Sequence, residues 1–155
     1  MTNFDILELD QKPTSHLSDI LINLQNSCQK SIDPKYFYDE NGSKLFEKIT
    51  NSLDYYPTKS ELEILDKQKK LITKYFPEKS IIVEFGSGSN KKINKFINAI
   101  RNPSEYIPID ISKEFLLKNA KKFAKQNPEL KVTAICADFI KSNFDDIIKK
   151  KKKTK

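Results

Sequence analysis

The chain has 155 residues and a formal net charge of +7, a length that permits one domain or part of a larger one. Residues 149–155 hold six lysines and no acid, so the rest of the chain is close to neutral. A lysine run of this kind is typically a solvated end, so we expect a disordered tail and no nucleic acid as a partner.

Residues 1–77 are predicted to form an N-terminal helical segment. An irregular lead-in is expected over residues 1–14, and residues 15–31 carry apolar residues at helical spacing. An aromatic cluster follows Pro34, a turn is expected at residues 40–43, and a short helix should contain Leu45, Phe46 and Ile49.

A longer helix is predicted to begin at Thr58 and to end near Phe76, just before Pro77. Thr58 and Glu61 have the spacing of a capping box, in which a hydroxyl and a carboxylate satisfy backbone N–H groups of the first turn. The preceding segment, Asp54–Pro57, should separate this helix from the shorter one.

Residues 78–148 are predicted to form part of a cofactor-binding domain with the order β-α-β-α-β. Helices are expected at about 89–101 and 113–127, each ending before a proline. Right-handed crossovers between such strands give a parallel sheet that binds ligands at the carboxyl ends of its strands. The predicted fold class is therefore α/β. The apolar runs expected to be strands are Ser80–Phe85, Tyr106–Asp110 and Val132–Phe139.

The turn Gly86-Ser87-Gly88 follows the first of these strands, and its small residues would let backbone N–H groups approach a nucleoside. A dinucleotide site would need a third small residue where Lys91 stands, and no Gly-Lys-Ser/Thr follows as in a P-loop. S-adenosylmethionine contains adenosine without phosphates and fits this pattern better. Asp110, at the end of the next strand, is a candidate for binding the ribose hydroxyls. Asp138 and Phe139, after the third strand, are candidates for contacts with adenine.

Each of these residues also has a structural explanation. The glycines can shape a tight turn, and Asp110 can cap the next helix, although Ser112 is the better cap. Asp138 can be a loop acid. Glu84 is either a buried carboxylate satisfied by backbone N–H groups or an acid that orients the methionine part of the cofactor.

Cys28 and Cys136 are the two cysteines of the chain, and we expect both to be buried thiols in a reducing compartment. No apolar run is long enough to span a membrane, and residues 1–10 lack an apolar leader. We therefore predict a cytoplasmic protein without a membrane partner. His16 lies outside every motif and is expected on the surface, and we predict no metal site.

A series of motifs runs in unbroken order from about residue 33 to residue 140. They are Pro34–Asp39, Gly42–Phe46, Ile49–Thr50, Tyr55–Thr58, Glu61, Ile64–Leu65, Glu84–Ser89, Pro108–Asp110 and Cys136–Phe139. The series resembles the histidine-specific methyltransferases, which use S-adenosylmethionine to trimethylate the α-amine of histidine on the way to ergothioneine. The segment Tyr55–Thr58 makes the resemblance specific, because it is not general to methyltransferases.

The resemblance implies a Rossmann-like class I methyltransferase fold, S-adenosylmethionine as the cofactor and histidine as a small-molecule substrate. The cofactor contacts that it implies are Gly86, Lys92, Asp110, Asp138 and Phe139, with Tyr38 as a weaker candidate. It also matches Tyr55 to a tyrosine that contacts the amino-acid substrate, whereas the residues alone favour a core aromatic between two helices. It assigns no catalytic residue here.

Members of this family are longer and carry further strands and an inserted substrate-binding region. A lysine run implies A-rich coding DNA, in which a single-base slip shifts the reading frame. We therefore expect the N-terminal half of a longer enzyme. In the family the strand corresponding to 81–85 lies mid-sheet, so here it is expected to become a free edge that invites self-association.

The predicted function is thus an S-adenosylmethionine-dependent N-methyltransferase, truncated and of impaired activity. One alternative is a remnant that binds the cofactor without catalysis. A second alternative is a basic protein that binds nucleic acid through the lysine tail.

Overall fold

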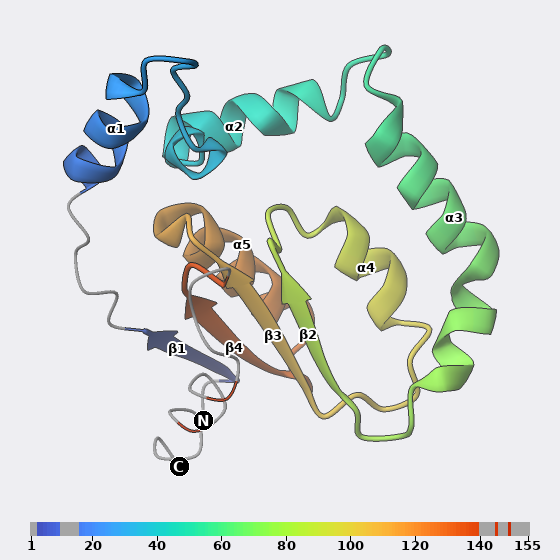
Figure 1. Ribbon diagram of the computed structural model, residues 1–155. Helices are drawn as coiled ribbons and strands as arrows, with labels where there is room; N and C mark the ends of the chain where they lie inside the picture. Colours follow the sequence, from blue (N-terminus) through green and yellow to red (C-terminus); the bar gives the residue numbers. More distant parts are fainter. Residues whose placement is uncertain (1–2, 10–15, 140–144, 146–148, 150–155) are drawn as a thin grey trace.

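The computed structural model describes residues 3–9, 16–139, 145 and 149 (Figure 1). Within these residues, four strands form one parallel sheet in the order β1-β4-β3-β2. The strands are β1 (Phe4–Glu8), β2 (Ile81–Phe85), β3 (Glu105–Asp110) and β4 (Lys131–Cys136). The helices α4 (Lys91–Ile97) and α5 (Lys113–Gln126) connect β2, β3 and β4 in turn. The predicted α/β class and the β-α-β-α-β order are confirmed.

The main apolar core lies between the sheet and these two helices. Both crossovers step in the same direction from β2 to β3 to β4, so right-handed connections place α4 and α5 on the same face. Tyr106 of β3 packs against Phe123 of α5 with ring centroids 4.8 Å apart. The buried residues of this core are Ile82, Ile93, Ile97, Ile100, Tyr106, Leu116, Ala120, Phe123, Ala124, Leu130, Val132 and Ala134.

A smaller cluster occupies the other face of the sheet. It contains Leu7, Ile107, Ile109, Ile135 and Ala137. Residues 105–109 of β3 are all buried, as expected for a central parallel strand covered on both faces. The sheet therefore has a rigid centre from which the carboxyl ends of β2, β3 and β4 project.

The helical segment forms an arc over those carboxyl ends (Figure 1). It consists of α1 (His16–Gln25), η1 (Pro34–Phe37), α2 (Glu40–Ile49), α3 (Tyr56–Ile72) and η2 (Thr73–Tyr75). The arc packs on the helices of the sheet domain where α2 meets α5 and where α3 meets α4. Much of its apolar surface is exposed, including Leu17, Ile22 and Leu53.

The prediction of an irregular lead-in is wrong for β1, which pairs with β4 at the sheet edge. The two acidic side chains of β1 are tolerated in the strand because each forms an ion pair with a neighbouring element. Asp5 contacts Lys131 at 2.9 Å, and Glu8 contacts Lys113 at 2.8 Å. Residues 4–8 therefore belong to the sheet although they lie within the predicted helical segment.

The predicted capping box is also wrong, because α3 begins at Tyr56 and not at Thr58. Pro57 lies in the first turn, where its missing N–H and fixed φ favour helix initiation. The residue at the N-cap position is Tyr55, whose side chain makes no capping hydrogen bond. Thr58 and Glu61 thus lie inside the helix and not at its start.

Residues 40–43, predicted as a turn, form the first turn of α2. Asp39 caps this helix, and its Oδ1 accepts a hydrogen bond from the Gly42 N–H at 2.6 Å. Gly42 is required by close packing, because a Cβ there would lie 1.6 Å from the carbonyl oxygen of Phe37. The glycine thus marks the contact between η1 and α2.

The prediction of two buried thiols is wrong for Cys28, which is exposed, while Cys136 is half-buried; both are free. The side chain of His16 and the lysine-rich tail lie outside the described residues, apart from Lys149, which is exposed. No helix in the described part of the chain is both long and apolar enough to cross a membrane.

Candidate cofactor-binding site

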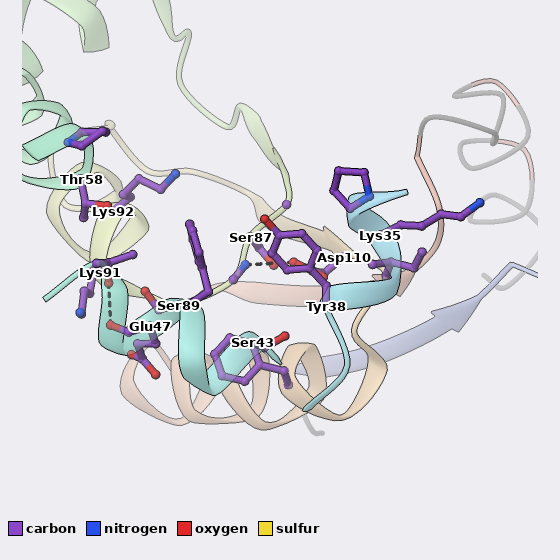
Figure 2. A pocket seen from close by; sticks show the side chains of 18 of the residues that line it. Lys35, Tyr38, Ser43, Glu47, Thr58, Ser87, Ser89, Lys91, Lys92 and Asp110 are labelled. Atoms are coloured by element: carbon purple, nitrogen blue, oxygen red, sulfur yellow. Dashed lines mark hydrogen bonds between the residues drawn. The ribbon is translucent and has the colours of Figure 1, made fainter. Parts of the chain in front are cut away.

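A cavity of about 490 Å³ lies at the carboxyl ends of β2, β3 and β4, beneath the arc of helices (Figure 2). Its floor comes from the segments that follow the three strands, and its roof from η1, α2 and α3. In Figure 2, Lys91, Lys92 and Thr58 lie toward one end, while Asp110, Tyr38 and Lys35 lie toward the other. The volume is typical of small-molecule sites.

The glycine loop after β2 forms the centre of the floor. Gly86 and Gly88 adopt φ values of 63° and 46°, the left-handed region that favours glycine. The N–H groups of Gly86 and Ser87 donate to the carbonyl of Ile109 at 2.8 and 3.2 Å, which ties the loop to β3. Apart from its chain neighbours, no atom of the described residues lies within 4 Å of a Cβ built on Gly86, so a ligand can approach the backbone there.

Asp110, at the end of β3, holds this loop from the side. Its Oδ2 accepts a hydrogen bond from the Gly88 N–H at 3.1 Å, and its Oδ1 accepts one from the Ser112 N–H at 2.9 Å. A carboxylate can accept about four hydrogen bonds, so both oxygens retain capacity for ribose hydroxyls.

The prediction that Ser112 is the N-cap of α5 is confirmed in position, although its side chain makes no cap hydrogen bond. Its Oγ instead accepts a hydrogen bond from Ser43 Oγ of α2 at 3.3 Å, and both residues are buried. This contact links the roof of the cavity to its floor.

Asp138 and Phe139 follow β4 and line the same cavity. The Ala137 N–H donates to the carbonyl of Asp110 at 3.0 Å, which brings the ends of β3 and β4 together. Asp138 is buried, whereas Phe139 is 37% exposed and lies 5.4 Å from the ring of Phe85. An apolar ring beside a buried acid suits the stacking and polar contacts of a purine.

Three aromatic residues of the helical segment also line the cavity, and we call them the aromatic wall. They are Tyr38, Phe46 and Tyr55. Phe46 makes edge-to-face contacts with both tyrosines, each at 6.0 Å between ring centroids. Tyr55 therefore lines the cavity and is not enclosed in a core between two helices.

Two lysines of the first turn of α4 reach across to the helical arc. Lys92 Nζ lies 3.3 Å from Glu61 Oε1 of α3, and Lys91 Nζ donates to Asn51 Oδ1 at 2.9 Å. Lys91, Lys92 and Glu61 line the cavity, whereas Asn51 does not. This end of the cavity thus carries positive and negative groups side by side.

Glu84 lies in β2 below the glycine loop and does not line the cavity. Tyr106 donates its hydroxyl proton to Glu84 Oε2 at 2.6 Å, so a side chain and not the backbone satisfies this carboxyl. Burial raises the pKa of Glu84, and the hydrogen bond from Tyr106 opposes the shift. Burial together with the nearby carboxylate also raises the pKa of Tyr106 far above its ordinary value, so the hydroxyl keeps its proton.

The structure brings all the residues singled out for binding to one cavity: Tyr38, Tyr55, Gly86, Lys92, Asp110, Asp138 and Phe139. Sequence reasoning missed much of the roof, which includes Lys35, Ser43, Glu47 and Thr50. Helical spacing separates the buried and exposed faces of such helices but does not tell which face a cavity will use. Among the described residues, no group of His, Cys, Asp or Glu side chains could hold a metal ion.

Comparison with known proteins yields one family for nearly the whole chain. The family described as "Histidine-specific methyltransferase, SAM-dependent" matches residues 16–155. The chain belongs to this family. S-adenosylmethionine is the cofactor that the family uses, and the glycine loop, Asp110 and Phe139 line the one cavity described above.

Curated relatives include two bacterial proteins named histidine N-alpha-methyltransferase. That of Mycobacterium tuberculosis is 32% identical over 78% of this chain and 38% of its own length. That of Mycolicibacterium smegmatis is 34% identical over 73% of this chain and 36% of its own length. Ergothioneine biosynthesis protein 1 of Neurospora crassa is 33% identical over 61% of this chain. The chain thus spans little more than a third of the length of the two bacterial relatives.

Proposed function

We propose that this chain binds S-adenosylmethionine in the cavity and is the cofactor-binding part of a methyltransferase that acts on the α-amine of histidine. One observation carries the proposal: the ends of β2, β3 and β4 place Gly86, Asp110 and Phe139 around one cavity. This is the edge of a parallel sheet where nucleoside ligands bind. Histidine as the acceptor is supported by the family description and by the names of the two bacterial relatives.

In this proposal each part of the floor has a separate task. The backbone of Gly86 and Gly88 approaches the cofactor without steric hindrance, and Asp110 binds the ribose hydroxyls. Asp138 and Phe139 hold the adenine, and Lys92 contacts the amino-acid end. These residues would hold the cofactor against the sheet, beneath the helical arc.

When bound, S-adenosylmethionine supplies an electrophilic methyl group on its sulfonium. The residues of this chain then position the nucleophile and exclude water. Positioning alone can lower the barrier to such a transfer substantially. Tyr55, in the aromatic wall, is the proposed contact for the amino-acid substrate. The amine must lose a proton for the transfer, and we assign no residue of this chain to that step.

A second candidate function is cofactor binding without methyl transfer. It is supported by the assignments proposed for the cavity, which give several residues to the cofactor and only Tyr55 to the amino-acid substrate. The prediction of a cytoplasmic location stays untested beside either function.

Calorimetry with S-adenosylmethionine tests the shared part of both functions, and mass spectrometry of histidine incubated with the chain and the cofactor separates them. We expect saturable binding, which Asp110→Asn should weaken about tenfold or more, because one charge-assisted acceptor is lost. Asp54→Asn, at an exposed position outside the cavity, should bind as the wild type does. Absence of binding by the wild-type chain would reject both candidates, while binding without methylated histidine would favour the second.

A further inference from the structure

We infer that Glu61 binds the ammonium group at the amino-acid end of the cofactor and forms, with Lys92, a two-charge clamp for that end. The inference rests on the proposed function, because it assumes that S-adenosylmethionine occupies the cavity. The sequence pattern had predicted a different role for Glu61, in a capping box with Thr58.

Glu61 has no capping role in the structure. Because α3 begins at Tyr56, the carboxylate of Glu61 lies beyond the first turn and too far along the helix to bond its unpaired N–H groups. Among the described residues, its hydrogen-bond partner is Lys92 of α4. Helix capping therefore does not explain why an acidic side chain lines the cavity at this position.

The position of Glu61 suits a ligand with separated charges. Glu61 and Lys92 both line the cavity at 3.3 Å from each other, and their side chains are 52% and 38% exposed. Asp110 lies toward the opposite end in Figure 2. A nucleoside held at Asp110 would thus direct the amino-acid end of the cofactor toward Lys92 and Glu61.

The chemistry of that end matches the pair. An α-amino acid carries an ammonium and a carboxylate on the same carbon, and the pair offers one charge of each sign at a comparable separation. Lys92 can bind the carboxylate while Glu61 binds the ammonium. A partly exposed ion pair contributes little by itself, so exchanging the Glu61–Lys92 contact for contacts with the ligand costs little.

A second ion pair supplies an internal control for this argument. Asp66 of α3 and Lys95 of α4 form another contact between the same two helices, and neither residue lines the cavity. If Glu61 served only to join α3 to α4, its loss and the loss of Asp66 would have the same consequences. If Glu61 binds the ligand, only its loss would alter ligand binding.

The test measures the affinity of two ligands by calorimetry. S-adenosylhomocysteine carries the amino-acid end, and 5′-methylthioadenosine keeps the adenosine but lacks that end. We expect Glu61→Gln to weaken S-adenosylhomocysteine about tenfold, the difference between a charged and a neutral hydrogen bond, and to leave 5′-methylthioadenosine unchanged. Asp66→Asn should leave both affinities unchanged.

The outcomes separate this inference from the proposed function. If the wild-type chain binds neither ligand, the proposed function itself fails. If the wild type binds both but Glu61→Gln retains full affinity for S-adenosylhomocysteine, or loses affinity for both ligands equally, the inference is wrong and the proposed function stands. Should Glu61→Gln unfold, Glu61→Asp keeps the charge and must retain the preference for S-adenosylhomocysteine.

Discussion

Asp110 shows how one side chain serves both the fold and the cavity. Its two oxygens accept hydrogen bonds from the Gly88 and Ser112 N–H groups, so the carboxylate fixes the glycine loop and the start of α5. The same carboxylate lines the cavity. A structural role and a place in the cavity wall, which looked like alternatives in the sequence, therefore coincide at this residue. Glu84, by contrast, is enclosed and paired with Tyr106.

The raised pKa of Glu84 predicts a specific pH dependence of stability. Since burial raises the pKa above its ordinary value of 4.5, the folded chain binds this proton more tightly than the unfolded chain does. The contribution of Glu84 is then fully present below pH 4.5 and is lost as the pH rises through the raised pKa. Glu84→Gln keeps an acceptor for Tyr106 but cannot ionise.

Urea unfolding at about pH 4 and about pH 8 tests this prediction. The free energy of unfolding of Glu84→Gln should rise relative to that of the wild type between the two pH values. Glu129→Gln, at an exposed position, serves as the control and should follow the wild type. A constant difference between Glu84→Gln and the wild type would contradict the argument.

Among the elements, α5 and the strands β2, β3 and β4 were predictable because local pattern and tertiary role agree. The helix was predicted at 113–127 and is found at Lys113–Gln126, since its apolar stripe and the following proline define both ends. β1 was missed because its acidic residues become compatible with a strand only through Lys131 and Lys113. The start of α3 was misplaced because Pro57 initiates the helix before Thr58.

Gly42 controls how α2 docks on η1. A side chain at this position would place its Cβ 1.6 Å from the Phe37 carbonyl oxygen, so the two elements would have to separate. We expect Gly42→Ala to lower the free energy of unfolding by about 1–3 kcal/mol, the usual cost of overpacking. The greater helix propensity of alanine offsets at most about 1 kcal/mol of that cost.

Asn41→Ala, at an exposed position of the same helix, is the matched control and should change stability little. Urea unfolding of the two variants gives the comparison. Because Tyr38 directly follows η1 and Phe46 lies in α2, and both belong to the aromatic wall, Gly42→Ala should also weaken ligand binding. Equal stability of Gly42→Ala and wild type would show that α2 can shift without cost.

At the scale of the whole molecule, the described sheet has two edges, β1 and β2, and the edge at β2 exposes large apolar side chains. Within the described residues β2 pairs with β3 alone, and Ile81 and Phe85 are 53% and 50% exposed. A parallel strand with apolar residues on both faces is normally covered on both sides. This free edge was predicted from the family topology, and it is the feature that most distinguishes the molecule from a closed α/β domain.

The free edge predicts self-association through a second copy of this chain, since edge strands pair readily with one another. Light scattering should show a mass that rises with protein concentration. Ile81→Lys should shift the association to higher concentration by placing a charge beside the edge. Ile22→Lys, which alters a similarly exposed isoleucine of α1, should leave the association unchanged; an equal effect of both variants would locate the contact elsewhere.

The floor of the cavity could be predicted from the sequence, whereas most of the roof could not. Gly86, Asp110 and Phe139 lie at or shortly after the ends of strands, and parallel strands bring their carboxyl ends to one edge whatever the details of packing. Lys35 and Glu47 reach the cavity only because the arc of helices passes over that edge. The direction of the arc depends on contacts such as Ser43 with Ser112, which no local pattern encodes.

The pairing of β1 with β4 has a consequence for the order in which the chain acquires its structure. Asn3 donates from its side-chain amide to the carbonyl of Leu130, 127 residues away, and β1 finds its partner strand only beyond that point. During synthesis from the N-terminus, β1 therefore waits until residues 131–136 have been made, while α4, β3 and α5 can assemble from neighbouring segments. Closing so long a loop is slow, so the attachment of β1 should be the last event of folding.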